Sequence, residues 1–301
     1  MTTSRARPVL RGARGTAGAR SALRLPGRGG QLQAVLLLSA CSLGCATAAT
    51  AEPGSAADLQ VVGGVPAAVL ELGGVASEPG RAEYELLVAG QGSRSALVWM
   101  PEGPPRTLIV LLHGAAQPSQ GSRPVHNLDA SRSLLDCLAL PALGFLSPII
   151  IAPRSPDGRW WNRSDTEYVL GLVLAARNRW PAAAAQSVIL GYSNGGIGAW
   201  YFARLYPQYF AAAIPMAFSS EIVGPTQLPV YAIFGSKDEL FDAALTERAL
   251  QAAVQSRQDV TLNEKYRGSH FAPCSYVPEL RSAGHWLQQR VLPAASSEGG
   301  S

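Results

Sequence analysis

Residues 187–200, SVILGYSNGGIGAW, give the clearest indication of how this chain folds. Its first four residues form a candidate buried strand, and an alanine- and glycine-rich helical segment follows. Between them lies Gly191-Tyr192-Ser193-Asn194-Gly195, which fits the pattern G-x-S-x-G. This pattern is typical of a very tight strand-to-helix turn, in which small residues two positions before and after the serine relieve crowding. We therefore expect the hydroxyl of Ser193 to stand clear of the sheet edge, beside a helix N-terminus that favours negative charge. The alternative is an ordinary glycine-rich turn.

Candidate strands and helices alternate along the chain on both sides of this turn. Apolar runs such as 107–112, TLIVLL, are typical of strands that are covered on both faces. We expect strands at 84–89, 96–100, 107–112, 148–152, 187–190, 211–218, 230–234 and 260–266, and helices near 128–140, from Ser164 to about Trp180, after Ser193, and over 241–255 and 277–291. Ser164 and Glu167 have the spacing of a capping box at a helix start. The alternation from residue 107 onwards predicts one α/β domain with a mostly parallel sheet and helices on both faces.

This domain is expected to span residues 81–293. Residues 52–80 are rich in Gly, Ala and Pro, and we interpret them as a linker that leads into the domain. Residues 294–301 are small and polar, which predicts a disordered tail.

Residues 1–51 have the layout of an export signal. An Arg-rich start is followed by an apolar run at 34–38 and then by small residues, as in a secretory signal peptide. The run is too short for a permanent membrane anchor. The stretch 38–41, Leu-Ser-Ala-Cys, resembles a bacterial lipobox in which Cys41 becomes lipidated, whereas 49–51, Ala-Thr-Ala, fits ordinary cleavage. We expect an exported protein, either secreted or a cell-envelope lipoprotein held to the membrane only through lipid on Cys41.

The formal net charge of +4 is misleading about the partners of the domain. Seven of the chain's 25 basic residues lie within residues 1–40, which contain no acid, so the basic residues that remain are fewer than the 21 acids. A net acidic body gives no reason to expect a nucleic-acid partner.

Two cysteines, Cys137 and Cys274, lie in the predicted domain. An exported chain permits a disulfide between them. Isolated cysteines also occur as small buried apolar residues, and the sequence favours two separate buried thiols over a bridge.

Four predicted strand ends carry residues with chemical potential. In a parallel sheet, ligands gather at the carboxyl ends of the strands. One end is 112–116, a glycine turn whose backbone N–H groups can point at an anion, and another is Ser193 itself. Asp238 follows the predicted strand at 230–234, and His270 follows the last predicted strand.

The order Ser193, Asp238, His270 resembles the α/β-hydrolase superfamily, in which nucleophile, acid and base follow in this order. The likeness covers residues from about 83 to 292. Three further stretches are loosely similar to secreted esterases of the polyhydroxyalkanoate-depolymerase and feruloyl-esterase type and to the phospholipase/carboxylesterase group: Leu-Leu-His-Gly at 111–114, Tyr-Pro-Gln-Tyr-Phe at 206–210 and the Trp-rich loop at 159–163.

The resemblance implies a role for each of these residues. Ser193 would be the nucleophile, His270 the base and Asp238 the acid that orients the base. The backbone N–H groups of Ala115 and Asn194 would form the oxyanion hole. The residues leave alternatives: His285 for the base, and Glu239 or Asp242 for the acid. No metal or organic cofactor is expected, since no motif has zinc-ligand, dinucleotide or P-loop spacing.

Three aromatic residues near these strand ends are candidates for substrate binding. Trp160 and Trp161 are adjacent in a loop and cannot both easily face one core, so one of them could line a pocket. Packing against the helix below is the alternative for the pair. Tyr192, next to the predicted nucleophile, could be either a core residue or part of a pocket wall.

These residues predict an exported serine hydrolase that acts on small-molecule or polymeric carboxylic esters. The 45 positions from Ser193 to Asp238 hold one predicted helix and two predicted strands, which leaves no room for a large cap domain. An open site would suit short-chain, aryl or polymer-end esters. The alternatives are a serine peptidase or amidase with the same three residues, and a catalytically silent surface protein or lipoprotein.

Overall fold

The computed structural model describes Leu72, residues 78–115 and residues 127–292, all within one compact unit, with the side chains of 127–129 excepted. The predicted signal peptide, the lipobox at 38–41 and the tail at 294–301 lie outside these residues and stay predictions, as does most of the predicted linker. None of the helices in the described ranges is long and apolar enough to cross a membrane.

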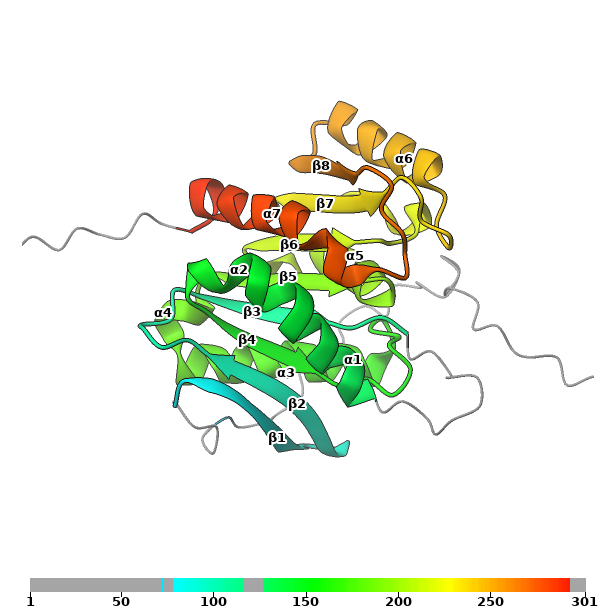
Figure 1. Ribbon diagram of the computed structural model, residues 1–301. Coiled ribbons are helices and arrows are strands. Elements are labelled where there is room, and N and C mark those ends of the chain that lie inside the picture. Colours follow the sequence, from blue (N-terminus) through cyan, green and yellow to red (C-terminus); the bar gives the residue numbers. More distant parts are fainter. Residues whose placement is uncertain (1–71, 73–77, 116–126, 293–301) are drawn as a thin grey trace, which may run out of the picture. The chain divides into compact units, whose positions relative to one another are not determined.

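The domain is built on an eight-stranded sheet with the order β1-β2-β4-β3-β5-β6-β7-β8 (Figure 1). The strands are β1 (Gly80–Val88), β2 (Gly92–Met100), β3 (Thr107–Leu112), β4 (Pro148–Pro153), β5 (Ser187–Tyr192), β6 (Ala212–Met216), β7 (Val230–Gly235) and β8 (Val260–Lys265). β2 pairs antiparallel with β1 and β4, while the neighbours from β4 to β8 pair in parallel. The predicted α/β class with a mostly parallel sheet is confirmed.

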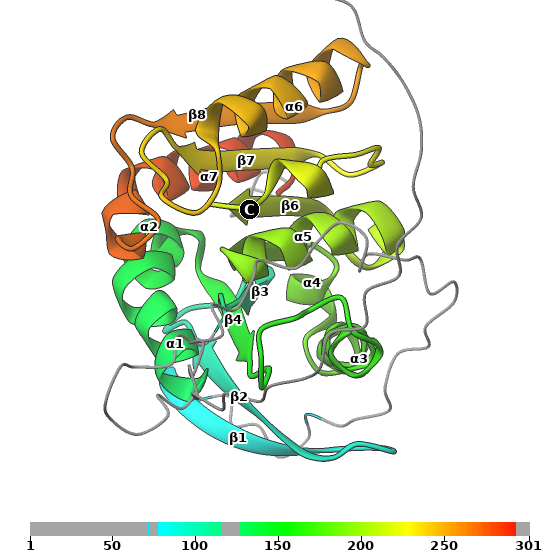
Figure 2. The ribbon, with the colours of Figure 1, turned by 90° about the vertical axis from the view of Figure 1, so that its right-hand side faces the viewer.

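Helices cover both faces of this sheet (Figures 1 and 2). The longer ones are α1 (Asn127–Leu134), α3 (Arg163–Arg179), α5 (Asn194–Leu205), α6 (Ala243–Gln255) and α7 (Val277–Arg290). The shorter ones are η2 (Leu135–Ala139), α2 (Leu140–Leu143), η3 (Gly144–Leu146), α4 (Pro181–Ala184), η4 (Pro207–Tyr209), η5 (Ser220–Ile222) and η6 (Pro273–Tyr276).

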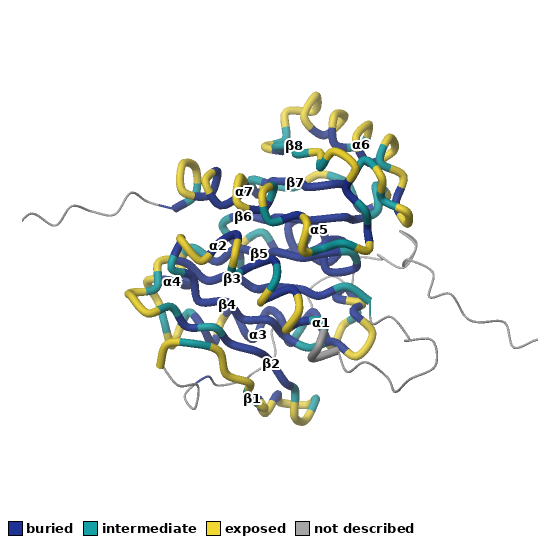
Figure 3. Tube along the Cα trace, viewed as in Figure 1, coloured by how far each residue is buried: buried dark blue, intermediate teal, exposed yellow. Residues whose placement is uncertain are grey.

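The alternation of side chains along β3 divides the core into two layers. Leu108, Val110 and Leu112 pack in the layer that contains buried residues of α3, α5 and α6, whereas Ile109 and Leu111 pack in the layer with η2, α2 and α7. Successive side chains of a strand point to opposite faces, so an apolar run without gaps fits a strand with both faces covered. Figure 3 shows the central strands buried along their length, whereas the edge strand β1 has exposed stretches.

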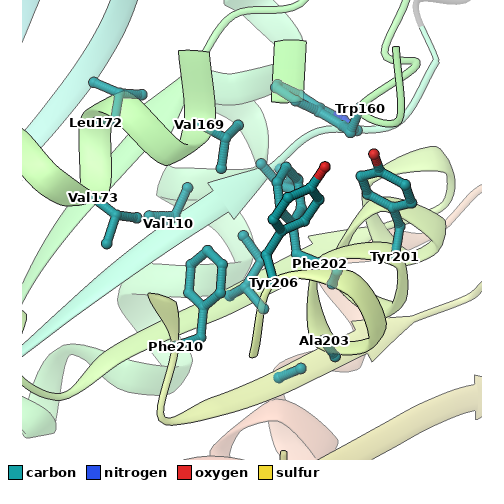
Figure 4. Close-up of a cluster of buried hydrophobic side chains, with 14 of the residues drawn as sticks. Val110, Trp160, Val169, Leu172, Val173, Tyr201, Phe202, Ala203, Tyr206 and Phe210 are labelled. Atoms are coloured by element: carbon teal, nitrogen blue, oxygen red, sulfur yellow. The ribbon is translucent and has the colours of Figure 1, made fainter. Parts of the chain in front are cut away.

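An aromatic-rich cluster fixes α5 to α3 and the sheet (Figure 4). Phe202, in α5, lies 5.9 Å from the rings of both Tyr206 and Phe210, measured between ring centroids. Full burial of a phenylalanine side chain contributes roughly 1.5–3 kcal/mol. This packing holds the helix whose first turn follows Ser193.

One predicted helix start is wrong, and one predicted helix is not a regular α-helix along its whole length. The N-cap of α3 is Asn162, whose side chain accepts a hydrogen bond from the backbone N–H of Asp165, so Ser164 does not begin a capping box. Glu167 instead accepts hydrogen bonds from Arg163 and Gln91. The predicted helix at 128–140 is interrupted by the π-helical turn η2.

Cys137 and Cys274 form a disulfide, with their Cα atoms 5.2 Å apart. The expectation of two separate buried thiols is therefore wrong. The bond joins η2 to η6, two elements whose cysteines are 137 positions apart in sequence, so local sequence patterns carry no sign of their contact.

No cap domain interrupts the sheet between Ser193 and Asp238. This part of the chain, all of it described, consists of α5, β6, β7 and the short turns η4 and η5. The predicted absence of a large insertion here is confirmed.

Candidate active site

Ser193 occupies the turn between β5 and α5 in a backbone conformation that few residues adopt, with φ 59° and ψ −122°. A serine held there stores of order 1–3 kcal/mol of strain. The close approach of neighbouring backbone explains both glycines of the motif. A Cβ on Gly191 would lie 1.9 Å from the carbonyl oxygen of Gly195, and one on Gly195 would lie 2.0 Å from that of Leu112. Ser193 is anchored to β6 by its N–H, which donates to the carbonyl of Met216 at 3.0 Å.

The structure brings together Ser193, His270 and Asp238 from three strand ends. Nε2 of His270 lies 2.9 Å from Oγ of Ser193, and Nδ1 lies 2.9 Å from Oδ2 of Asp238. The side chains of His270 and Asp238 are only 5% and 3% exposed. This continuous chain of hydrogen bonds can carry a proton from the serine to an imidazole that a carboxylate stabilises.

The Asp238 carboxylate is held by backbone donors on the side away from the histidine. Its Oδ1 accepts from the N–H groups of Leu240 and Phe241 at 2.9 and 2.8 Å. The loop after β7 thereby fixes the direction of Oδ2, which faces the imidazole.

The alternative acids, Asp242 and Glu239, and the alternative base, His285, make contacts outside the Ser193–His270–Asp238 hydrogen-bond chain. Asp242 caps α6, since its Oδ1 accepts from the N–H of Leu245 at 3.0 Å. Glu239 accepts from Ser269 and from the backbone of His270, not from the imidazole. His285 lies in α7, where its ring is 4.7 Å from that of Phe145.

Tyr192 supports the loop that carries His270. It is 5% exposed, and its hydroxyl donates to the carbonyl oxygen of His270 at 2.9 Å. Burial, with smaller contributions from Tyr276 and Asp238, raises the pKa of Tyr192 well above its ordinary value, so this donor stays protonated. The ring of Phe241 adds an edge-on contact with the imidazole, 5.2 Å between centroids.

The strand end of β3 is pinned through His113. The backbone N–H of Ser155 donates to Nε2 at 3.0 Å, so Nδ1 carries the proton and donates to the carbonyl of Gly114 at 2.6 Å. Burial lowers the pKa of His113 to about 4, against a smaller opposing effect of the Gly114 carbonyl. A neutral imidazole therefore fits this site. Trp160 adds a hydrogen bond from its indole N–H to the carbonyl of His113 at 2.8 Å.

The pinned segment lies directly against the serine. A Cβ on Gly114 would be 3.0 Å from Cβ of Ser193 and 3.4 Å from its Oγ. Ala115 is the next residue, and Asn194 is the first residue of α5, where a backbone N–H has no acceptor within the helix. Both backbone positions expected to donate to an oxyanion are thus close to Ser193 in the chain or in space.

The two tryptophans do not behave as expected. Trp160 is 0% exposed, and a Cβ on Gly198 of α5 would meet its Cβ at 2.7 Å. Trp161 is 8% exposed and belongs to the same core layer. Both side chains thus pack in one core layer, as the packing alternative for the pair holds, and Trp160 has no free surface with which to contact a substrate.

A buried polar network behind the β3 strand end was not predicted from the sequence. Asp165, 1% exposed, forms an ion pair with Arg94 and accepts from Oγ of Ser155 at 2.6 Å. Oγ of Ser155 in turn accepts from the N–H of Gly158 at 2.9 Å. The only sequence signal is the turn-forming Ser-Pro-Asp-Gly at 155–158.

Within the described ranges, no three His, Cys, Asp or Glu side chains are grouped so that they could hold a metal ion. No protein-family model matches this chain, and no curated protein sequence matches it.

Solved structures do match, and they define the fold class. The hydrolase FphF of Staphylococcus aureus, described as fluorophosphonate-binding, is 15% identical with a TM-score of 0.53 over 70% of this chain and 99% of its own. XC6422 of Xanthomonas campestris, described as an α/β serine hydrolase without a lid, is 19% identical with a TM-score of 0.52 over 72% and 98% of the two chains. The S-formylglutathione hydrolase FrmB of Staphylococcus aureus is 14% identical, with a TM-score of 0.53 over 69% and 98%. The chain therefore has the α/β-hydrolase fold.

Proposed function

We propose that this protein is a serine hydrolase that cleaves carboxylic esters through an acyl-enzyme. The observation that carries the proposal is the chain of hydrogen bonds from Ser193 through His270 to Asp238, with 2.9 Å at each step. A serine hydroxyl is a weak nucleophile near neutral pH and needs such a base.

The reaction follows from the positions of these groups. His270 takes the proton of Ser193 as Oγ attacks the ester carbonyl carbon, and Asp238 stabilises the imidazolium that forms. The N–H groups of Ala115 and Asn194 bind the oxygen that becomes negative; one such donor contributes about 3–4 kcal/mol to the transition state. The imidazolium then gives its proton to the leaving alkoxide, and the C–O bond to the alcohol breaks. Water, deprotonated by His270, attacks the acyl carbon, and the carboxylic acid leaves as Ser193 regains its proton.

The structural neighbours support a hydrolase function, because they include serine hydrolases and an S-formylglutathione hydrolase. A putative dipeptidyl aminopeptidase IV of Bacteroides ovatus also matches, with a TM-score of 0.51 over 36% of its own chain. This match supports the alternative proposal of a serine peptidase. Turnover of a matched pair, p-nitrophenyl acetate and the p-nitroanilide of the same acid, separates the two. We expect Ser193-dependent hydrolysis of the ester, with the anilide at least about 100-fold slower.

Because no cap domain is inserted between Ser193 and Asp238, we propose small or protruding ester substrates, such as short-chain esters, aryl esters or polymer ends. A long lipid chain is commonly sequestered from water, and residues 194–237 supply no inserted cap domain to do this. In a series of p-nitrophenyl esters, kcat/KM is expected to be highest for the shortest acyl chains. A maximum at twelve or more carbons would contradict this.

We further propose that the protein is exported, on the evidence of residues 1–51. The intact mass of the mature protein tests this. Cleavage before Cys41 with added acyl mass supports a lipoprotein, cleavage after Ala51 supports secretion, and an uncleaved chain in the cell envelope contradicts both.

A further inference from the structure

Glu239 connects the two loops that carry the acid and the base. Its Oε1 accepts from the hydroxyl of Ser269 at 2.8 Å, and its Oε2 accepts from the backbone N–H of His270 at 2.7 Å. Glu239 follows Asp238 directly, so the loop after β7 touches His270 twice, once at the ring through Asp238 and once at the backbone through Glu239.

These contacts continue a series of hydrogen bonds beyond the last paired residues of β7 and β8. Ser236 donates its N–H to the carbonyl of Lys265 at 3.1 Å, and Lys237 donates to that of Gly268 at 3.1 Å. The N–H of Arg267 donates to Oγ of Ser236 at 2.7 Å. Backbone and short side chains make these earlier links, and the Glu239 carboxylate extends the series to the backbone N–H of His270.

The backbone of His270 is thereby fixed on both sides. Glu239 holds its N–H, while Tyr192 of β5 holds its carbonyl oxygen at 2.9 Å. The imidazole must meet Asp238 and Ser193 at the same time, and a displacement of about 1 Å can reduce a rate about 100-fold. Phe271, the next residue, is 59% exposed, so packing on that side contributes little to holding the loop.

We propose that Glu239 is a positioning residue for His270: its carboxylate clamps the base loop to the acid loop and so sets the distance from the imidazole to Ser193. This proposal rests on the proposed function, because it assigns Glu239 a role in that same reaction. An exposed carboxylate contributes little to overall stability. The clamp should therefore affect the rate far more than folding.

The test compares Glu239→Ala, Glu239→Gln and the control Glu247→Ala, which removes an exposed glutamate of α6. We expect E239A to lower kcat for a short-chain p-nitrophenyl ester about 10- to 100-fold, with KM within about twofold of wild type. E239Q keeps an oxygen that can accept from the His270 N–H and an amide that can donate to Ser269, so its kcat should stay within about threefold. Thermal unfolding midpoints should agree among all four proteins.

Equal kcat values for E239A and E247A would overturn the proposal, and so would E239Q that is as slow as E239A. If E239A does not fold, Glu239→Asp replaces it, because its shorter carboxylate cannot span both partners. Slow kcat in E239D then supports the clamp, and wild-type kcat overturns it. Ser193→Ala, measured alongside, distinguishes the two failures: turnover that does not need Ser193 defeats the proposed function, whereas Ser193-dependent turnover unchanged in E239A defeats only the clamp.

Discussion

At the scale of single residues, backbone crowding around Ser193 explains why glycines lie two positions before and two positions after it. Gly191 and Gly195 are needed because carbonyl oxygens of neighbouring segments lie where a Cβ would project. Ser193 keeps a positive φ because its N–H is tied to Met216 and α5 starts at the next residue. The close backbone packing between β5, α5 and β6 therefore also fixes the position of the Ser193 hydroxyl.

Gly195→Ala tests this directly. The new Cβ would lie 2.0 Å from the carbonyl oxygen of Leu112, a backbone atom that cannot move without disturbing β3. We expect the free energy of unfolding, measured with urea, to fall by about 3 kcal/mol or more. The matched control is Gly103→Ala, where nothing lies within 4 Å of the added atom. Equal stability of the two variants would contradict the account.

His113 provides a test that depends on pH. Burial lowers the pKa of His113 to about 4 from 6.5, so below pH 6.5 the unfolded chain binds a proton that the folded chain rejects. The contribution of the neutral imidazole to stability is therefore present above about pH 6.5 and is lost as the pH falls toward 4. The Asp165 and Asp157 charges favour protonation and Arg154 opposes it, but desolvation dominates.

The comparison is between wild type and His113→Gln, which cannot titrate. Between pH 6.5 and 4.5, wild type should lose about 2 kcal/mol more unfolding free energy than the variant. Parallel pH profiles for the two proteins would show that the histidine does not titrate as inferred.

At the scale of elements, the base loop is held at both of its ends. Its first residues follow β8, which is paired with β7, and η6 behind it is joined to η2 by the Cys137–Cys274 disulfide. His270 lies between these two anchors, and Cys274 follows it by four positions. The disulfide therefore secures η6, an element adjacent to the candidate site, to η2 in the same core layer.

Replacing both cysteines by serine should lower the free energy of unfolding by about 2–5 kcal/mol, because the bond closes a long loop in the unfolded chain. Urea unfolding of the double variant measures this change, and wild type treated with reductant should behave like the variant. Unchanged stability in both would contradict a structural role for the bond.

At the scale of the whole domain, the sequence predicts the parts that depend on local pattern. The apolar runs place the parallel strands, and the G-x-S-x-G motif with its flanking strand and helix places Ser193. Strand-end positions suffice to predict that Asp238 and His270 come near it, because the carboxyl ends of parallel strands share one edge.

Features that depend on packing between distant segments cannot be predicted from local sequence patterns. The disulfide requires η2 to meet η6, and the choice between Asn162 and Ser164 as N-cap depends on where the preceding loop delivers the chain. The direction of the Glu239 side chain, toward the His270 backbone and not its ring, is likewise a matter of loop geometry. Trp160 and Trp161 lie in the turn that precedes α3, and both are buried there.

Covalent modification by a fluorophosphonate shows whether Ser193 is an activated nucleophile. We expect a single adduct on the peptide that contains Ser193, absent in Ser193→Ala and formed at least about 100-fold more slowly in His270→Ala. A folded wild-type protein that forms no adduct, or an S193A variant that is labelled as fast as wild type, would contradict it.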